Sequence, residues 1–133
     1  MKKLAINGVY KHFKGDYYCV VGISEPIYLD ELLDLSEIGK VRLDSYRSLH
    51  TEKNRHTSLY KADDGTDIKY FHNRRIEDGE LVIYKCISNL DKADLYLRPV
   101  DMFLSEVDSK KYPEVEQKNR FEFVGTFKEI LFK

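Results

Sequence analysis

The sequences GVYKHFKGDYYCVVG, residues 8–22, and ELVIYKCISNLDKADLYLRPVDMFLSEV, residues 80–107, decide the fold of this chain. Each contains short apolar stretches separated by polar or glycine-containing turns, a pattern typical of strands joined in hairpins. Neither sequence can bury its apolar residues alone, so we expect the two to come together in a small barrel. The predicted barrel comprises residues 4–23 and 80–124, and residues 24–79 form an insertion.

The length and aromatic content favour one domain rich in strands. The chain has 133 residues, with ten Tyr, seven Phe and no Trp. This length is typical of a single domain with one core, and Tyr and Phe are enriched in strands. We therefore expect residues 1–133 to form one domain of mainly β (α+β) class. Its architecture should be a partly open barrel like those of Src-homology-3 or Tudor domains, with an inserted helix and extra strands.

In the first part of the predicted barrel, apolar residues alternate over Val9–Phe13 and Tyr17–Ile23. Gly15 lies between them and favours a tight turn, so the two strands should form a hairpin. The second strand is apolar on both faces, which indicates a strand that is buried on both sides or borders a pocket. We expect Pro26 to end this strand, because proline has no N–H to donate to a ladder.

The insertion should contain one helix and three short strands. Leucines recur at helical spacing from Leu29 to Ile38, acidic residues occupy the other face, and Gly39 follows where a helix would end. We expect this leucine stripe to pack against the barrel. The three strands should begin near Val41, at Thr57–Lys61 and at Asp67–Phe71.

The second part of the predicted barrel begins with its strongest strand pattern, Leu81–Ile87, which is rich in branched and aromatic residues. The elements expected after it are a strand at Leu95–Arg98, a helical turn at Val100–Phe103 started by Pro99, a last barrel strand at Leu104–Val107, a turn from Asp108 to Tyr112, an apolar segment at Phe121–Val124, and a short closing helix at Phe127–Leu131.

The sequence contains no motif that indicates catalysis. Its His, Cys and acidic residues show no nucleophile–base pattern, no glycine-rich phosphate loop and no metal-ligand spacing. We therefore expect no catalytic residues, no metal site and no cofactor, although a site assembled only in three dimensions leaves no such motif. Cys19 and Cys86 lie in apolar strand patterns and should be reduced structural thiols.

Charge is nearly balanced overall but unevenly distributed. The net charge is −1 and the isoelectric point is near 6.4. Residues 24–39 are acidic and residues 40–75 are rich in bases, and such runs are normally solvated surface. Basic residues that would face a nucleic acid are Lys40, Arg42, Arg47, Lys53, Arg55, Arg74 and Arg75. A nucleic-acid partner is disfavoured because the domain as a whole is not basic. The amino terminus lacks a secretory or membrane-spanning pattern, so we expect a cytoplasmic protein without membrane contact.

The candidate ligand-binding residues come from the barrel: Tyr10, His12, Tyr18, Tyr84, Tyr96 and Arg98. Each combines an apolar body with a polar tip, and aromatic rings beside a guanidinium suit a planar or anionic ligand. The alternative is that these tips hydrogen-bond one another inside the barrel. Two functions remain: a non-catalytic recognition module for a protein segment or a nucleic acid, or a small-molecule or nucleotide-binding protein. A deep pocket containing Arg98 favours the second, and a shallow groove favours the first.

Several short motifs carry a resemblance to a known family. In order, they are Tyr10–Gly15 (YKHFKG), Tyr18 with Val20, Leu81–Lys85 (LVIYK), Leu97–Pro99 (LRP), Met102–Phe103, Tyr112–Glu114 (YPE) and Arg120–Glu122 (RFE). In this order they resemble the domain of unknown function 1653 family, a small bacterial and phage-associated group. The departure is residues 24–79, where the family has a shorter connection. The resemblance implies no established activity.

Overall fold

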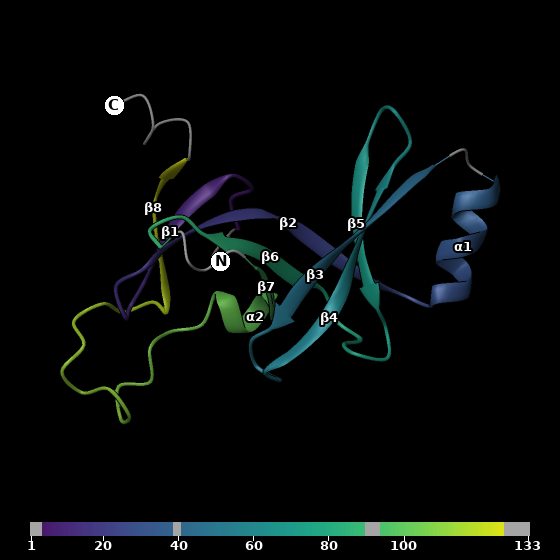
Figure 1. The fold of residues 1–133 in the computed structure, drawn as a ribbon. Coiled ribbons are helices and arrows are strands. Elements are labelled where there is room, and N and C mark those ends of the chain that lie inside the picture. The colour runs from purple at the N-terminus through teal and green to yellow at the C-terminus, as the bar shows by residue number, and fades with distance from the viewer. Residues whose placement is uncertain (1–3, 39–40, 90–93, 127–133) are drawn as a thin grey trace.

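In the computed structural model of the chain, described over residues 4–38, 41–89 and 94–126, strands dominate (Figure 1). The elements are β1 (Gly8–His12), β2 (Tyr17–Ile27), α1 (Leu29–Ile38), β3 (Arg42–His50), β4 (Arg55–Asp63), β5 (Ile68–Asn73), β6 (Leu81–Cys86), β7 (Leu95–Pro99), α2 (Val100–Phe103) and β8 (Phe121–Thr126). The predicted closing helix at Phe127–Leu131 lies outside the described residues.

Six of the strands close into a ring. The strand order is β5-β4-β3-β7-β6-β2-β1-β8, and an additional pairing of β5 with β2 joins the first strand to the sixth. β1 and β8 continue the sheet outside this ring. The prediction of a mainly β fold with a barrel, an inserted helix and extra strands is confirmed, but the ring is closed where a partly open barrel was expected.

β2 closes the ring because it changes partners along its length. Its first part pairs antiparallel with β1 and β6, and the pairing with β6 ends at Ser24↔Leu81. At Ser24 it also begins to pair in parallel with β5, and this pairing continues to Ile27. The prediction that Pro26 ends the strand is therefore wrong. At Pro26 the ladder runs to β5 but no longer to β6, and a proline is tolerated where one side of a strand is unpaired.

The strands of the predicted insertion are part of the barrel. β3 pairs in parallel with β7, and β4 joins β3 to β5, so residues 42–73 supply half of the ring. The predicted barrel segments 4–23 and 80–124 contribute β2, β6 and β7 to it, whereas β1 and β8 lie outside. The difference arises because parallel pairing joins segments far apart in the chain, which no local pattern reveals.

The predicted strand at Leu104–Val107 is also wrong. This segment leaves α2 through backbone hydrogen bonds from Leu104 N to Val100 O, 3.0 Å, and from Ser105 N to Met102 O, 3.3 Å. These bonds continue the helical turn and prevent an extended start. An isolated bridge between Glu106 and Asn119 follows.

The interior of the ring combines an aliphatic core with buried polar residues. Leu59, Leu81, Ile83 and Leu97 form one buried cluster. Residues paired across neighbouring strands project from the same face, and the pairings Ile83↔Leu97, His50↔Leu97, Leu59↔His72 and Ser24↔Leu81 place the polar residues on that face. Ser24, Ser48, His50 and His72 are all fully buried.

A second core covers the outside of the ring next to β1 and β8. We call it the aromatic core; its buried members are Tyr10, Val20, Val82, Tyr84, Phe103 and Phe121. Phe103 of α2 and Phe121 of β8 stack at 4.0 Å with an interplanar angle of 10°. β6 therefore has apolar contacts on both faces, because Leu81 and Ile83 point into the ring and Val82 and Tyr84 point into the aromatic core.

α1 covers a third cluster far from β8 (Figure 1). Its bounds agree with the predicted helix, and Leu32 is buried against Ile27, Ala62 and Phe71. The other leucines of the predicted stripe are not buried: Leu29, Leu33 and Leu35 are 41%, 61% and 44% exposed. The helix touches the barrel along a narrow line, so one leucine carries most of the contact that was expected from the whole stripe.

Replacing Leu32 by Ala should lower the free energy of unfolding by about 2–5 kcal/mol, because it removes a buried leucine from a packed cluster. The matched control is Leu33→Ala on the same helix turn, where the side chain is 61% exposed and the loss should stay below about 0.5 kcal/mol. Chemical denaturation of both variants measures the difference, and equal losses would show that the helix packs differently.

Buried histidines close one end of the ring interior. Ser24 Oγ lies 2.7 Å from His72 Nδ1, and His72 Nε2 donates to the backbone oxygen of Glu77 at 3.0 Å. His50 Nε2 donates to the Glu77 carboxylate at 3.1 Å, and its Nδ1 accepts from Lys53 N at 3.3 Å. Burial lowers the pKa of His72 below its ordinary value of 6.5, despite the opposing hydrogen bonds.

Stability should fall as the pH drops below 6.5. In the unfolded chain His72 takes up a proton near its ordinary pKa of 6.5, whereas the folded protein resists protonation until a lower pH. The contribution of neutral His72 to the free energy of unfolding is thus complete above pH 6.5, and it is lost progressively as the pH falls towards the pKa of His72 in the folded protein. Urea titrations at pH 7 and about pH 5 should show that the free energy of unfolding changes less with pH in His72→Gln than in the wild-type protein. The control is His56→Gln, an exposed histidine, which should keep the wild-type pH dependence. An equal change of unfolding free energy with pH in all three proteins would contradict the assignment of this dependence to His72.

Candidate functional site

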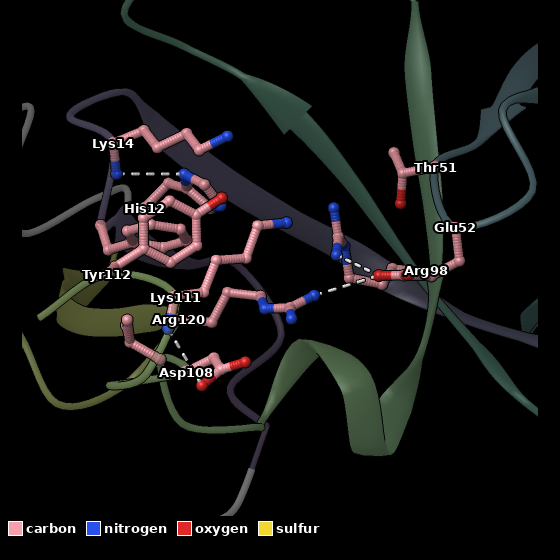
Figure 2. Close-up of a pocket in the computed structure, with 11 residues that line it drawn as sticks. His12, Lys14, Thr51, Glu52, Arg98, Asp108, Lys111, Tyr112 and Arg120 are labelled. Atoms are coloured by element: carbon pink, nitrogen blue, oxygen red, sulfur yellow. Dashed lines mark hydrogen bonds and ion pairs between the residues drawn. The ribbon is translucent and has the colours of Figure 1, made fainter.

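A pocket of about 560 Å³ lies where four parts of the chain meet (Figure 2). These parts are the β1–β2 turn, the β3–β4 turn, β7, and the segment between α2 and β8. The residues that line it are His12, Phe13, Lys14, Thr51, Glu52, Arg98, Val107, Asp108, Lys111, Tyr112 and Arg120. Most of these side chains are polar or charged.

Residues 104–120 form a loop whose two ends are held together by the backbone. Arg120 N donates to Ser105 O at 3.0 Å, and Val107 N donates to Lys118 O at 2.8 Å. The loop is also tied to the β1–β2 turn, because Phe13 N donates to Arg120 O at 3.0 Å. The backbone of Arg120 is therefore fixed on both sides, at the point where the loop enters β8.

Arg98 and Arg120 converge on one oxygen of Glu52. Arg98 Nη1 forms an ion pair with Glu52 Oε1, and Arg120 Nη1 lies 3.0 Å from the same atom. Arg98 is further held by Nε, which donates to Tyr84 Oη at 3.1 Å, and by Phe121, whose ring centre lies 5.6 Å from the guanidinium carbon. The aromatic core thus positions the Arg98 side chain at the pocket wall.

The two lysines of the pocket are arranged around Tyr112. Lys14 Nζ lies 5.7 Å from the centre of the Tyr112 ring, and Lys111 Nζ lies 5.5 Å from it. Phe13 packs edge-on against the same ring at 4.9 Å. Ammonium groups are attracted to aromatic faces, so Tyr112 helps to hold two cations in the same pocket as the arginine pair.

The charge of the pocket is positive. Four of its side chains are cationic and two are carboxylates, and both carboxylates already have partners. Glu52 is bound by the two arginines. Asp108 Oδ1 accepts from the backbone N–H groups of Lys110 and Lys111, at 3.0 and 3.4 Å, in the turn predicted to begin there. The arrangement therefore favours an anion.

The six predicted ligand-binding residues lie in or against the aromatic core, but only His12 and Arg98 line the pocket. Tyr10 and Tyr84 are buried, and Tyr18 and Tyr96 are half-buried against the core. The Tyr10 hydroxyl accepts from Ala5 N at 3.0 Å, and the Tyr84 hydroxyl is 3.4 Å from Thr51 Oγ1. The alternative weighed from the sequence was that these polar tips hydrogen-bond one another; Arg98 Nε does donate to Tyr84 Oη at 3.1 Å, whereas Tyr10 bonds a backbone N–H instead. Ligand binding by the six residues stays a prediction.

Sequence reasoning missed Glu52, Lys14, Lys111 and Arg120 as site residues. A signal existed for two of them, since Lys14 and Arg120 belong to the short motifs that carry the family resemblance, as does Tyr112. Glu52 lies in a polar turn and follows no periodicity, so no pattern could single it out.

Ser24 and His72 resemble a nucleophile–base pair, but they lie in the ring interior. Both residues are fully buried, and the remaining ring nitrogen of His72 is bound to a backbone oxygen instead of an orienting carboxylate. A substrate cannot reach this pair, so we assign it a structural role. Burial also raises the pKa of the free Cys19 thiol, which keeps it in its less nucleophilic form.

Residues 70–123 match the model of the family described as Protein of unknown function (DUF1653). The match confirms the suspected family over this part of the chain and includes Arg98, Lys111 and Arg120 but not Glu52. It begins within β5, inside the predicted insertion. Searches of curated proteins and of solved structures found no match, so the Src-homology-3 or Tudor likeness stays a prediction. Among the described residues, no helix is long and apolar enough to cross a membrane.

Replacing Arg98 by Ala should destabilise the protein by about 1–3 kcal/mol, because Tyr84 and Glu52 both lose a charged hydrogen-bond partner. The Arg98 side chain is only 14% exposed, so solvent compensates for little of this loss. Lys111→Ala serves as the control from the same pocket, since Lys111 is exposed and should change stability by less than about 0.5 kcal/mol. Thermal unfolding that is unchanged for Arg98→Ala would assign the residue to function alone.

Proposed function

We propose that this protein, part of which matches a family of unknown function, is a non-catalytic binding module that takes a small anionic ligand into the pocket beside Arg98. One observation carries the proposal: four cationic side chains from three parts of the chain line one pocket whose two carboxylates are already engaged. Bringing like charges together is unfavourable unless an anion compensates for them, so a binding role explains an arrangement that stability alone does not require.

The shape of the pocket favours a small ligand over a polymer. Its volume of about 560 Å³ lies within the usual range for small-molecule sites. Several basic residues considered for nucleic-acid binding have local partners: Arg42 pairs with Asp44 at 3.3 Å, and Arg74 with Asp78 at 2.6 Å. Arg47 likewise donates to His56 at 3.3 Å. Of the two functions that the sequence leaves open, these contacts support the small-molecule reading better than recognition of a nucleic acid.

The aromatic residues of the pocket support charge recognition more than stacking of a nucleobase. Tyr112 already has Lys14 and Lys111 near its ring and Phe13 at its edge. A base could stack there only by displacing one of these side chains. The ligand is therefore defined chiefly by its negative charge.

Small anions should raise the melting temperature of the protein. We would compare inorganic phosphate and sulfate with chloride at constant ionic strength, because a ligand that binds only the folded state stabilises it by mass action. The double variant Lys14→Ala/Lys111→Ala should weaken the response several-fold. Lys118→Ala should leave it unchanged, since Lys118 is exposed and pairs with Glu106 outside the pocket.

Two further ligands test the alternative that the protein binds a polymer, either a nucleic acid or a protein segment. A random oligonucleotide bound in preference to small anions, with affinity that falls steeply as salt rises, would favour the nucleic-acid reading. An acidic peptide bound in preference to both would favour recognition of a protein segment. Failure of any small anion to bind in a saturable manner would contradict the proposed function.

A further inference from the structure

We propose that the pocket binds a phosphate monoester, and that its phosphoryl group takes the place of the Glu52 carboxylate between Arg98 and Arg120. This inference rests on the proposed function and specifies its ligand. It starts from an imbalance in the arginine pair, where two guanidinium groups share a single carboxylate oxygen.

The arginine pair has unused donors. Both Nη1 atoms are directed at Glu52 Oε1, and each guanidinium carries five N–H donors in a fixed plane. Arg120 Nε is buried without a hydrogen-bond partner among the described residues. A buried charged donor without an acceptor is costly, so the pair is better suited to a group that offers more oxygens than the one Glu52 supplies. A phosphoryl group offers three, and arginine binds phosphate with two parallel hydrogen bonds.

The Arg98 side chain is fixed more firmly than the carboxylate beside it. Tyr84 and Phe121 hold the Arg98 side chain, and backbone hydrogen bonds to Ser105 and Phe13 hold the main chain of Arg120. Glu52, by contrast, projects from the short β3–β4 turn, and its side chain is 32% exposed. The carboxylate can therefore swing into solvent while the Arg98 guanidinium and the backbone of Arg120 stay in place for the ligand.

The charge balance selects a dianion. The four cations of the lining exceed its two carboxylates by two charges in the empty pocket, and by three once Glu52 has been displaced. A carboxylate ligand or a phosphate diester supplies one negative charge, whereas a phosphate monoester approaches two at neutral pH, because its second pKa is about 6. Lys111 lies next to Arg120, and Lys14 lies farther from the arginine pair near His12 (Figure 2); both lysines contact Tyr112 and add to the attraction.

Glu52 would then be a competitor that the ligand must displace. Its negative charge occupies the arginine pair in the empty pocket and repels an approaching phosphoryl group. Neutralising it should strengthen binding even though a hydrogen-bonding side chain of the same shape remains. A role in which Glu52 only stabilises the fold predicts the opposite, because its loss would loosen the arginines.

The experiment is a calorimetric titration of wild type and Glu52→Gln with phenyl phosphate, with diethyl phosphate as the monoanionic diester, at pH 7.5 and constant ionic strength. We expect phenyl phosphate to bind wild type, Glu52→Gln to bind it at least fivefold more tightly, and the diester to bind neither protein measurably. Glu106→Gln is the matched control, since Glu106 pairs with Lys118 at 3.4 Å outside the pocket, and it should bind as wild type does. Melting curves of each variant establish that it is folded at the assay temperature; Glu52→Ala replaces Glu52→Gln if the latter is not.

The outcomes separate this inference from the proposed function. If wild type binds phenyl phosphate but Glu52→Gln binds it equally or more weakly, displacement of Glu52 is overturned and the anion pocket stands. If the diester binds as well as the monoester, the assignment to a dianion is overturned. If no small anion binds any variant, the proposed function itself fails. A 5′-phosphorylated oligonucleotide and its 5′-hydroxyl counterpart form the last arm, and tighter binding of the former than of phenyl phosphate would replace the small molecule by a nucleic-acid end.

Discussion

The parallel pairing of β2 with β5 is the contact on which the rest of the structure depends. It spans only Ser24–Ile27 and Tyr70–Asn73, yet it joins the two ends of a row of six strands. Closure supplies a backbone partner for β5, which an open sheet would leave as an edge, and for the last residues of β2. It also encloses a core that contains buried aliphatic residues of β4, β6 and β7.

The pocket depends on the ring through β6. This strand has the ring interior on one face and the aromatic core on the other, so Tyr84 is fixed from behind by the barrel. The Tyr84 hydroxyl accepts a hydrogen bond from Arg98 on β7, and Arg98 forms an ion pair with Glu52 of the β3–β4 turn. The packing of Tyr84 therefore restricts Arg98 through a hydrogen bond, and Arg98 in turn restricts Glu52 through the ion pair.

Local sequence rules predicted the features that local forces determine. The β1–β2 hairpin, the bounds of α1 and the helical turn after Pro99 all follow from turn chemistry, periodicity or fixed backbone angles. The two parallel pairings, β2 with β5 and β3 with β7, do not, because they join segments of the chain whose patterns say nothing of each other. The same reason applies to the pocket. Arg98 could be predicted as a site residue because it lies close in sequence to aromatic strand residues, whereas Glu52 could not, because its partners are two arginines distant in sequence.

The order in which the ring pairs has a consequence for how the chain folds. β3, β4 and β5 form successive antiparallel pairs through short turns, so this half can assemble from neighbouring residues. β3 must then wait for β7, whose pairing residues begin at Leu95, well after those of β3 have been synthesised. Such distant contacts carry a large loop-closure entropy and slow the folding of β proteins. On the ribosome, one side of β3 stays unpaired until β7 has emerged, which leaves this edge of the nascent chain open to wrong partners.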